Sequence, residues 1–134
     1  MEQTEATLDA YYASLAPERR DDLLALRRLV LGTWPCTEDM ALDMPTFHLH
    51  GKPLFAVASH KHFMALYVVP YDLLEVFKND LMVFDRGRSC IRFKRLEPGT
   101  LILFDRIIKY VGNQKASSKA TAKHLLPKRQ LARS

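Results

Sequence analysis

The 134-residue chain has few cysteines and few glycines, and each shortage argues against a class of protein. Its two cysteines, Cys36 and Cys90, cannot form the disulfide framework of a small secreted domain, and they fit a reducing cytoplasm. Its five glycines form no phosphate-loop or dinucleotide-binding fingerprint. No apolar run approaches the roughly 18 residues of a membrane span, and the polar, acidic residues 1–5 do not resemble a secretory signal peptide. We therefore expect a cytoplasmic protein without membrane contact.

Acidic residues are missing from the last twenty positions, which carry six lysines and arginines. The whole chain has a formal charge of +5, so the basic character belongs to this tail and not to the part that precedes it. The prediction is one domain over residues 1–112 followed by a basic tail over residues 113–134. The tail contains no aromatic side chain for base stacking, so we expect at most weak, non-specific contact with nucleic acid.

The spacing of apolar residues predicts four helices. The first covers residues 7–15 with Thr7 as its N-cap, and the second begins at Pro17 and ends at Gly32. A helix over residues 71–79 and an amphipathic helix over residues 100–111 follow later in the chain.

Between residues 40 and 70 the apolar pattern alternates with a period of two, which is typical of strands. Turns centred on Gly51-Lys52 and on Lys61 would join three strands into a meander. A second hairpin is predicted around Gly87, between residues 82–84 and 90–93. The predicted fold class is α+β, a curved antiparallel sheet of about five strands packed by N-terminal, middle and C-terminal helices.

The predicted turns also set a register for the meander. In that register Phe47, Ala56 and Leu66 lie in one row of the core face. The opposite face would carry His48, Phe55 and Tyr67, which is too aromatic for a solvated sheet surface. We expect a helix, a second subunit or a ligand to cover it.

Several segments in one order resemble a known family. They are residues 8–15 followed by Pro17, Met44-Pro45-Thr46-Phe47 followed by Gly51-Lys52-Pro53, residues 63–67 with Pro70, and residues 87–94. Together they resemble the YdhG-like family of small bacterial proteins, a domain of unknown function. The resemblance implies a compact α+β fold with a curved antiparallel sheet, and a frataxin-like iron-chaperone role described for some members. Asp43 stands where the family often has glycine, and Arg88 where it often has lysine.

Arg88 and Arg92 are the candidate anion ligands of the late hairpin, because a guanidinium can hold a carboxylate or phosphate with two hydrogen bonds. The alternative is that these charges protect an edge strand from pairing with another chain. The acidic residues of the first helices could bind iron, although a solvated helix face also explains them. The histidine pairs 48/50 and 60/62 lack the further ligands of a structural zinc site, so we expect no bound metal.

No nucleophile, triad or cofactor motif is present in the sequence, which argues against an enzyme and predicts no cofactor. The leading hypothesis is a non-catalytic binding domain whose sheet face holds a small anionic ligand or a protein partner. Its predicted site residues are His48, Phe55, Tyr67, Arg88 and Arg92. The alternatives are a frataxin-like iron or metal chaperone, and an adaptor or homodimer that uses the same face.

Overall fold

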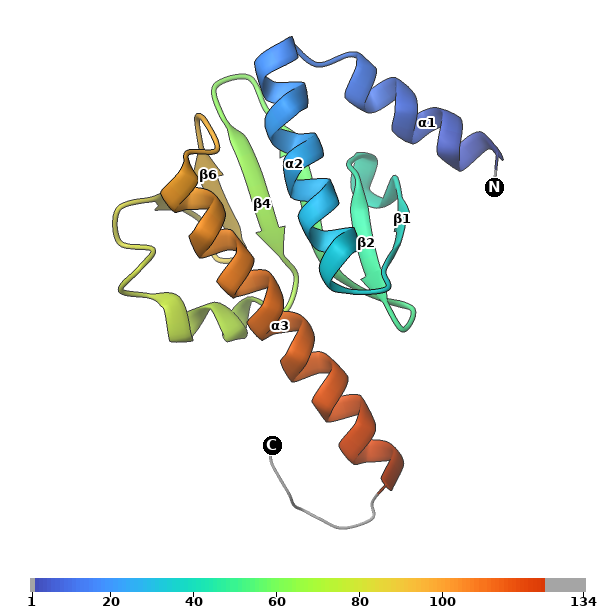
Figure 1. Cartoon of the computed structure of the whole chain (residues 1–134), viewed down its shortest axis with the longest axis vertical. Coiled ribbons are helices and arrows are strands. Elements are labelled where there is room, and N and C mark those ends of the chain that lie inside the picture. Colours follow the sequence, from blue (N-terminus) through green and yellow to red (C-terminus); the bar gives the residue numbers. More distant parts are fainter. Residues whose placement is uncertain (1, 125–134) are drawn as a thin grey trace.

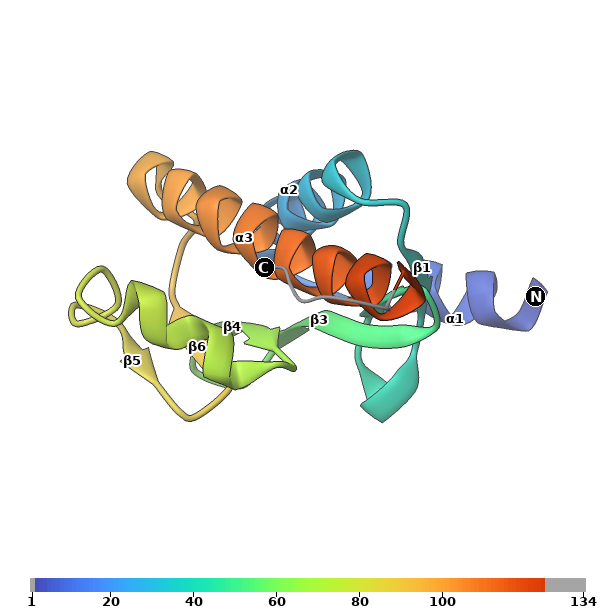
Figure 2. The same cartoon turned by 90° about the horizontal axis from the view of Figure 1, so that it is seen from below.

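The computed structural model describes residues 2–124, and the side chains of residues 6–116. An antiparallel six-stranded sheet with the order β1-β2-β3-β4-β6-β5 forms one layer, and helices form the other (Figures 1 and 2). This α+β architecture confirms the predicted fold class, with one strand more than expected. No helix in residues 2–124 is long and apolar enough to cross a membrane. The elements are α1 (Glu2–Ala13), α2 (Pro17–Thr33), β1 (Thr37–Asp39), η1 (Ala41–Asp43), β2 (Thr46–Leu49), β3 (Lys52–Ser59), β4 (Met64–Val68), η2 (Tyr71–Phe77), β5 (Asp85–Arg86), β6 (Cys90–Phe93) and α3 (Pro98–His124).

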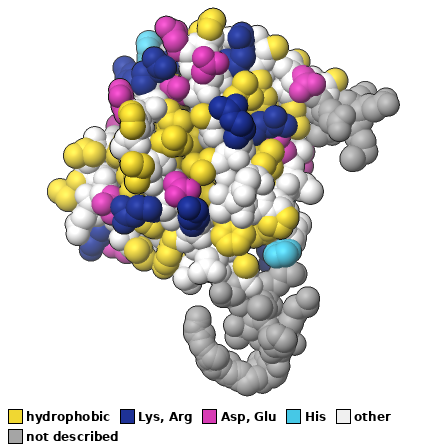
Figure 3. Space-filling view, in the orientation of Figure 1, with side chains coloured by type: hydrophobic (Ala, Val, Ile, Leu, Met, Phe, Trp, Pro, Cys, Tyr) yellow, Lys and Arg dark blue, Asp and Glu magenta, His cyan; other side chains and the backbone are white. Residues whose placement is uncertain are grey.

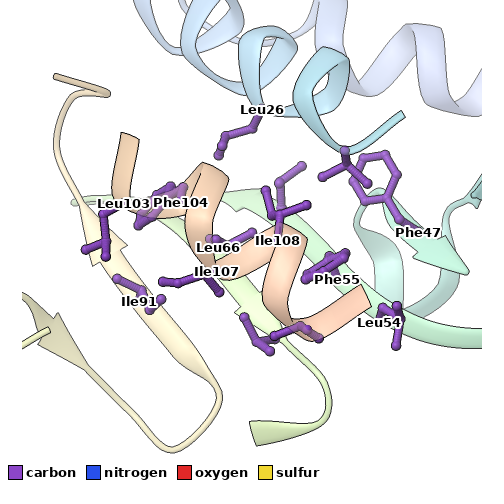
Figure 4. Close-up of a cluster of buried hydrophobic side chains, with 14 of the residues drawn as sticks. Leu26, Phe47, Leu54, Phe55, Leu66, Ile91, Leu103, Phe104, Ile107 and Ile108 are labelled. Carbon is purple, nitrogen blue, oxygen red and sulfur yellow. The ribbon is translucent and has the colours of Figure 1, made fainter. Parts of the chain in front are cut away.

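Helices α2 and α3 lie together on one face of the sheet, and the core lies between the two layers (Figure 2). Helix α2 begins at Pro17, a favourable first residue because the N–H that proline lacks would have no partner inside the helix. The helix buries a stripe of apolar side chains at helical spacing. Helix α3 contributes a second stripe that meets the strands (Figure 4). The fully buried members of these stripes are Leu23, Leu26, Val30, Phe104, Ile107, Ile108 and Val111.

Helix α3 continues past Val111, where the sequence predicted its end, and reaches His124. The first part of the predicted tail is therefore helical, and residues 125–134 lie outside the described residues. Trp34 packs on α3 where the helix was predicted to end, and its indole Nε1–H donates to the Ile108 carbonyl at 2.9 Å. A Cβ at Gly112 would lie only 2.1 Å from the indole ring. The glycine is needed here for close packing inside a helix.

The turn between β2 and β3 is centred on His50-Gly51 and not on Gly51-Lys52 as predicted, because Leu49 pairs with Lys52. Both turn residues have positive φ, 54° for His50 and 80° for Gly51. Two consecutive left-handed residues are characteristic of a type I′ turn, whose backbone twist matches the twist of the two strands that it joins.

The predicted register of β3 was wrong by one residue. Phe55 pairs with Phe47 on β2 and with Val68 on β4, and a bulge near His48 absorbs the shift on the β2 side. Phe55 is therefore fully buried beneath the helices and does not belong to the other face of the sheet (Figure 4). The error arose because residues 54–58 are all apolar and all buried, so alternation carried no information about which residues face the helices.

Four other elements differ from their predictions. Strand β1 was not predicted, since three polar residues at a sheet edge carry no apolar pattern. Residues 82–84 form turns, and the late hairpin instead uses Asp85–Arg86. The helix expected over residues 71–79 is the 3₁₀ helix η2. Helix α1 begins before Thr7, which is therefore not its N-cap.

Two tyrosines of α1 attach this helix to the sheet. The Tyr12 hydroxyl donates to the Glu38 carboxylate on β1 at 2.9 Å, and Arg27 of α2 donates to the other oxygen of that carboxylate at 2.7 Å. The Tyr11 hydroxyl accepts the Ser59 N–H at 2.8 Å, on the part of β3 that extends beyond β2. This hydroxyl satisfies a backbone donor that would otherwise be left at an open strand edge.

The segment before β2 holds two consecutive left-handed residues, Leu42 and Asp43, each with φ of 62°. Asp43 is exposed, so a glycine there removes backbone strain without removing a packed side chain. We expect Asp43→Gly to raise the free energy of unfolding by about 0.5–1 kcal/mol in urea denaturation. Asp21→Gly, at an exposed position inside α2, is the matched control and should lower it. A loss of stability in Asp43→Gly would contradict the assigned backbone geometry.

Candidate functional site

The face of the sheet turned away from α2 and α3 carries small side chains at its centre. We call it the open sheet face and define it by Ala56, Ala58, Ala65, Tyr67, Cys90 and Arg92, which the strand pairings place on one side. Its three alanines are buried although α2 and α3 lie on the opposite face. Tyr67 and His60 start from opposite ends of this alanine group, and their side chains meet in a 2.9 Å hydrogen bond. Together they cover the centre of the face.

The Tyr67 hydroxyl remains protonated over the physiological pH range. Burial raises its pKa, and the neighbouring Cys90 side chain raises it further. A neutral hydroxyl that is hydrogen-bonded to His60 holds that side chain in place. It does not supply a ready nucleophile.

Arg92 is the charged group of the open sheet face. Its Nη1 lies 3.0 Å from Asp85 Oδ1, and its guanidinium lies 5.5 Å from the centre of the Phe63 ring. The Asp85 side chain is 77% exposed, so the pair is solvated and contributes little to stability. An incoming anion could therefore replace the Asp85 carboxylate at small energetic cost, while Phe63 keeps the guanidinium oriented.

Arg92 also lines a cleft of about 580 Å³ at the end of β6, which we call the Arg92 cleft. The cleft lies between the β3–β4 turn, the segment that leads into β5, and the first turn of α3. Its walls combine apolar, basic and acidic side chains, and the acidic ones are Asp85 and Glu97. The apolar ones are Phe63, Val83, Phe84 and Phe93, and the basic ones are Arg92, Lys94, Arg95 and His62.

The basic groups of the Arg92 cleft are not equally available. Arg95 donates to Asp22 at 2.8 Å, and this hydrogen bond, with the charge of Asp22, raises the pKa of Arg95. The same carboxylate accepts the Leu96 N–H at 3.0 Å, so Arg95 and Asp22 hold the chain between β6 and α3. Lys94 has no ion-pair partner among the described side chains. Arg92 and Lys94 are therefore the cations that can meet a ligand.

Of the five residues that the sequence predicted for the site, Tyr67 and Arg92 lie on the open sheet face, and the strand pairings place His48 on the same side of the sheet, near its edge. Phe55 is in the core, as described above. His48 faces Asp39 on β1 at 3.0 Å, two strands away from Tyr67. Arg88 is exposed in the late hairpin, where its guanidinium stacks 5.1 Å from the Tyr71 ring centre and does not line the Arg92 cleft.

The Asp39 carboxylate is hydrogen-bonded to the Ala41 N–H and to His48. Burial alone would raise its pKa, but the Ala41 N–H and His48 outweigh that effect and lower it. The contact between His48 and Asp39 fixes the β1–β2 edge, and His48 contributes to stability there and not to the Arg92 cleft.

Three residues of the site were not among the predicted ones: His60, Phe63 and Lys94. The alternation of residues 90, 92 and 94 on one strand face was a usable signal for Lys94. His60 and Phe63 join the site only because the β3–β4 turn folds back beside β6, which depends on the exact register.

In the described part of the chain, no group of three or more His, Cys, Asp or Glu side chains could hold a metal ion. Both cysteines are free thiols.

A comparison with solved structures finds a crystal structure of a protein from the DUF1801 family, YdhG of Bacillus subtilis. The TM-score is 0.72 at 18% sequence identity, and the match covers 83% of this chain and 92% of that chain. The likeness confirms the fold that the YdhG-like sequence resemblance implied. No family model and no curated protein matches the chain.

Proposed function

We propose that this protein is a small non-catalytic binding domain that holds an organic anion in the Arg92 cleft. The observation that carries the proposal is the position of Arg92, on β6, and of Lys94, just beyond the end of that strand, where both line a cleft that aromatic rings also line. Specific binding sites typically combine an apolar lining with a few convergent polar groups.

The composition of the Arg92 cleft favours a carboxylate or phosphate attached to an apolar body. The guanidinium of Arg92 can bind two oxygens of such a group, and the Lys94 ammonium adds a second positive charge. Phe84 and Phe93 offer apolar surface for the rest of the ligand. A free inorganic anion would use only the charged part of the cleft and should bind more weakly.

Thermal unfolding with added ligand tests this proposal. We expect phenyl phosphate and benzoate to raise the melting temperature by about 4 °C at ten times their Kd, since binding to the folded state alone stabilises it. Benzyl alcohol, which has the ring without the charge, should have much less effect. Arg92→Ala/Lys94→Ala should abolish the response to both anions.

Arg88→Ala is the matched control, because Arg88 is an exposed arginine of the same hairpin that does not line the cleft. This variant should keep the full response to phenyl phosphate. A response that survives Arg92→Ala/Lys94→Ala, or one that is lost in Arg88→Ala, would move the site away from the Arg92 cleft.

The iron-chaperone alternative remains a prediction, and no arrangement of described side chains favours it. Two free thiols support a reducing compartment, so we place the anion-binding activity in the cytoplasm.

A further inference from the structure

Large apolar side chains are exposed on the helix side of the molecule, away from the open sheet face. Ile102 of α3 is 63% exposed, and Met82 and Val83, in the segment before β5, are 78% and 87% exposed. Space-filling atoms show apolar side chains grouped between charged ones over α2 and α3 (Figure 3). Exposed apolar surface of this kind typically marks a contact with another molecule.

Ile102 lies where two hollows meet. A groove of about 530 Å³ runs between α2 and α3 and is lined by Ala25, Leu29, Leu101 and Ile102. A second hollow joins Ile102 to Val83 and Phe84. The two hollows therefore adjoin at Ile102, between α2 and the segment before β5. We call the first of these hollows the α2–α3 groove.

The charges at the rim of the α2–α3 groove have opposite signs on its two sides. Arg28 lies on the α2 side and Asp105 on the α3 side. Asp105 pairs with Lys109 of its own helix at 2.9 Å, and Arg28 has no ion-pair partner among the described side chains. A partner whose charges were all of one sign would be repelled either by Arg28 or by Asp105.

We propose that the α2–α3 groove binds a second copy of this chain in a two-fold symmetric dimer. A two-fold axis through the groove places Arg28 of each copy against the partner's Asp105, so both ion pairs form in the same arrangement. In the same arrangement the Ile102 side chains of both copies are buried in the interface and removed from water. This surface is separate from the sheet face that the sequence suggested for a homodimer, and the proposal does not depend on anion binding.

Sedimentation equilibrium of the full chain from about 1 to 200 μM tests the dimer, over the range where weak homodimers dissociate. We expect the natural chain to dimerise and Ile102→Glu to weaken the dimer at least about tenfold, because the glutamate would be buried without a partner. Leu42→Glu is the matched control, an equally drastic change at a side chain that is 75% exposed and lies outside the groove. It should leave dimerisation unchanged.

A charge reversal tests the symmetric pairing itself. Arg28→Asp alone and Asp105→Arg alone should each weaken the dimer, because like charges then meet across the axis. The double variant Arg28→Asp/Asp105→Arg should restore it, because the pairs re-form with their signs exchanged. Circular dichroism melts of each variant report whether the fold is intact. A natural chain that is monomeric at 200 μM, equal effects of Ile102→Glu and Leu42→Glu, or no rescue in the double variant would each overturn the proposal.

Discussion

Gly112→Ala is expected to lower the free energy of unfolding by about 3 kcal/mol, although alanine is the better helix former. The added methyl carbon would lie 2.1 Å from the Trp34 indole, far inside van der Waals contact. The ring cannot easily move away, because its Nε1–H is hydrogen-bonded to the Ile108 carbonyl. Urea denaturation followed by far-ultraviolet circular dichroism measures the change.

Removing the indole should reverse the sign of this effect. In a Trp34→Ala background, Gly112→Ala has space for its methyl group and should stabilise the protein by about 0.5–1 kcal/mol through helix propensity. The double-mutant cycle separates the steric clash from the intrinsic preference of the helix. If Gly112→Ala destabilises both backgrounds equally, contact with Trp34 is not the reason for the glycine.

Phe55→Ala is expected to cost about 3–5 kcal/mol, the range for truncating a fully buried phenylalanine. Phe55 lies beneath the helices, with Phe47 and Val68 as its strand neighbours. In the register first predicted from the sequence, the same side chain would lie on the opposite face and would cost much less to remove. The equilibrium unfolding free energy therefore distinguishes the two registers.

Phe55→Leu provides a milder variant if Phe55→Ala does not fold, and it should cost roughly 1 kcal/mol. Tyr67→Phe is the matched control on the open sheet face. It keeps the ring and loses the hydrogen bond with His60, so it should cost about 1 kcal/mol. A loss at Phe55→Ala no larger than that at Tyr67→Phe would contradict the observed register.

The helices and most strands could be predicted because their signals are local. Helix α2 begins at a proline and shows one apolar stripe, and both features are visible in the sequence without any tertiary information. In strand β6 the partly exposed Arg92 stands between the buried Ile91 and Phe93. The sequence separated Arg92 from Ile91 and Phe93 along one strand, whereas the pairing of β6 with β4, which puts Arg92 on the same face as Tyr67, came from the structure.

The remaining features depend on contacts between distant residues. Strand β1 has no apolar residue, and its Glu38 is buried because Tyr12 and Arg27 converge on it from two helices. Gly112 directly follows an apolar stripe, a position typical of a helix end, yet α3 continues, and the glycine instead leaves room for the Trp34 indole. Phe55 could not be assigned to a face, because both faces of its strand are apolar.

The anion site was predicted only in part for the same reason. The strand pattern identifies Arg92 and Lys94, but the Arg92 cleft exists only because the first turn of α3 and the β3–β4 turn meet at the end of β6. The sequence alone therefore placed Arg88 and His48 in the site, whereas their side chains contact Tyr71 and Asp39.

The most direct test of anion binding in the Arg92 cleft is a titration of the ¹⁵N-labelled protein with phenyl phosphate, followed by amide chemical shifts. We predict progressive, saturable shifts for Phe63, Arg92, Lys94 and Thr100, which line the cleft, with little change at His48 and Arg88. Saturable shifts centred on His48 or Arg88, or none at the residues of the cleft, would contradict the proposed function.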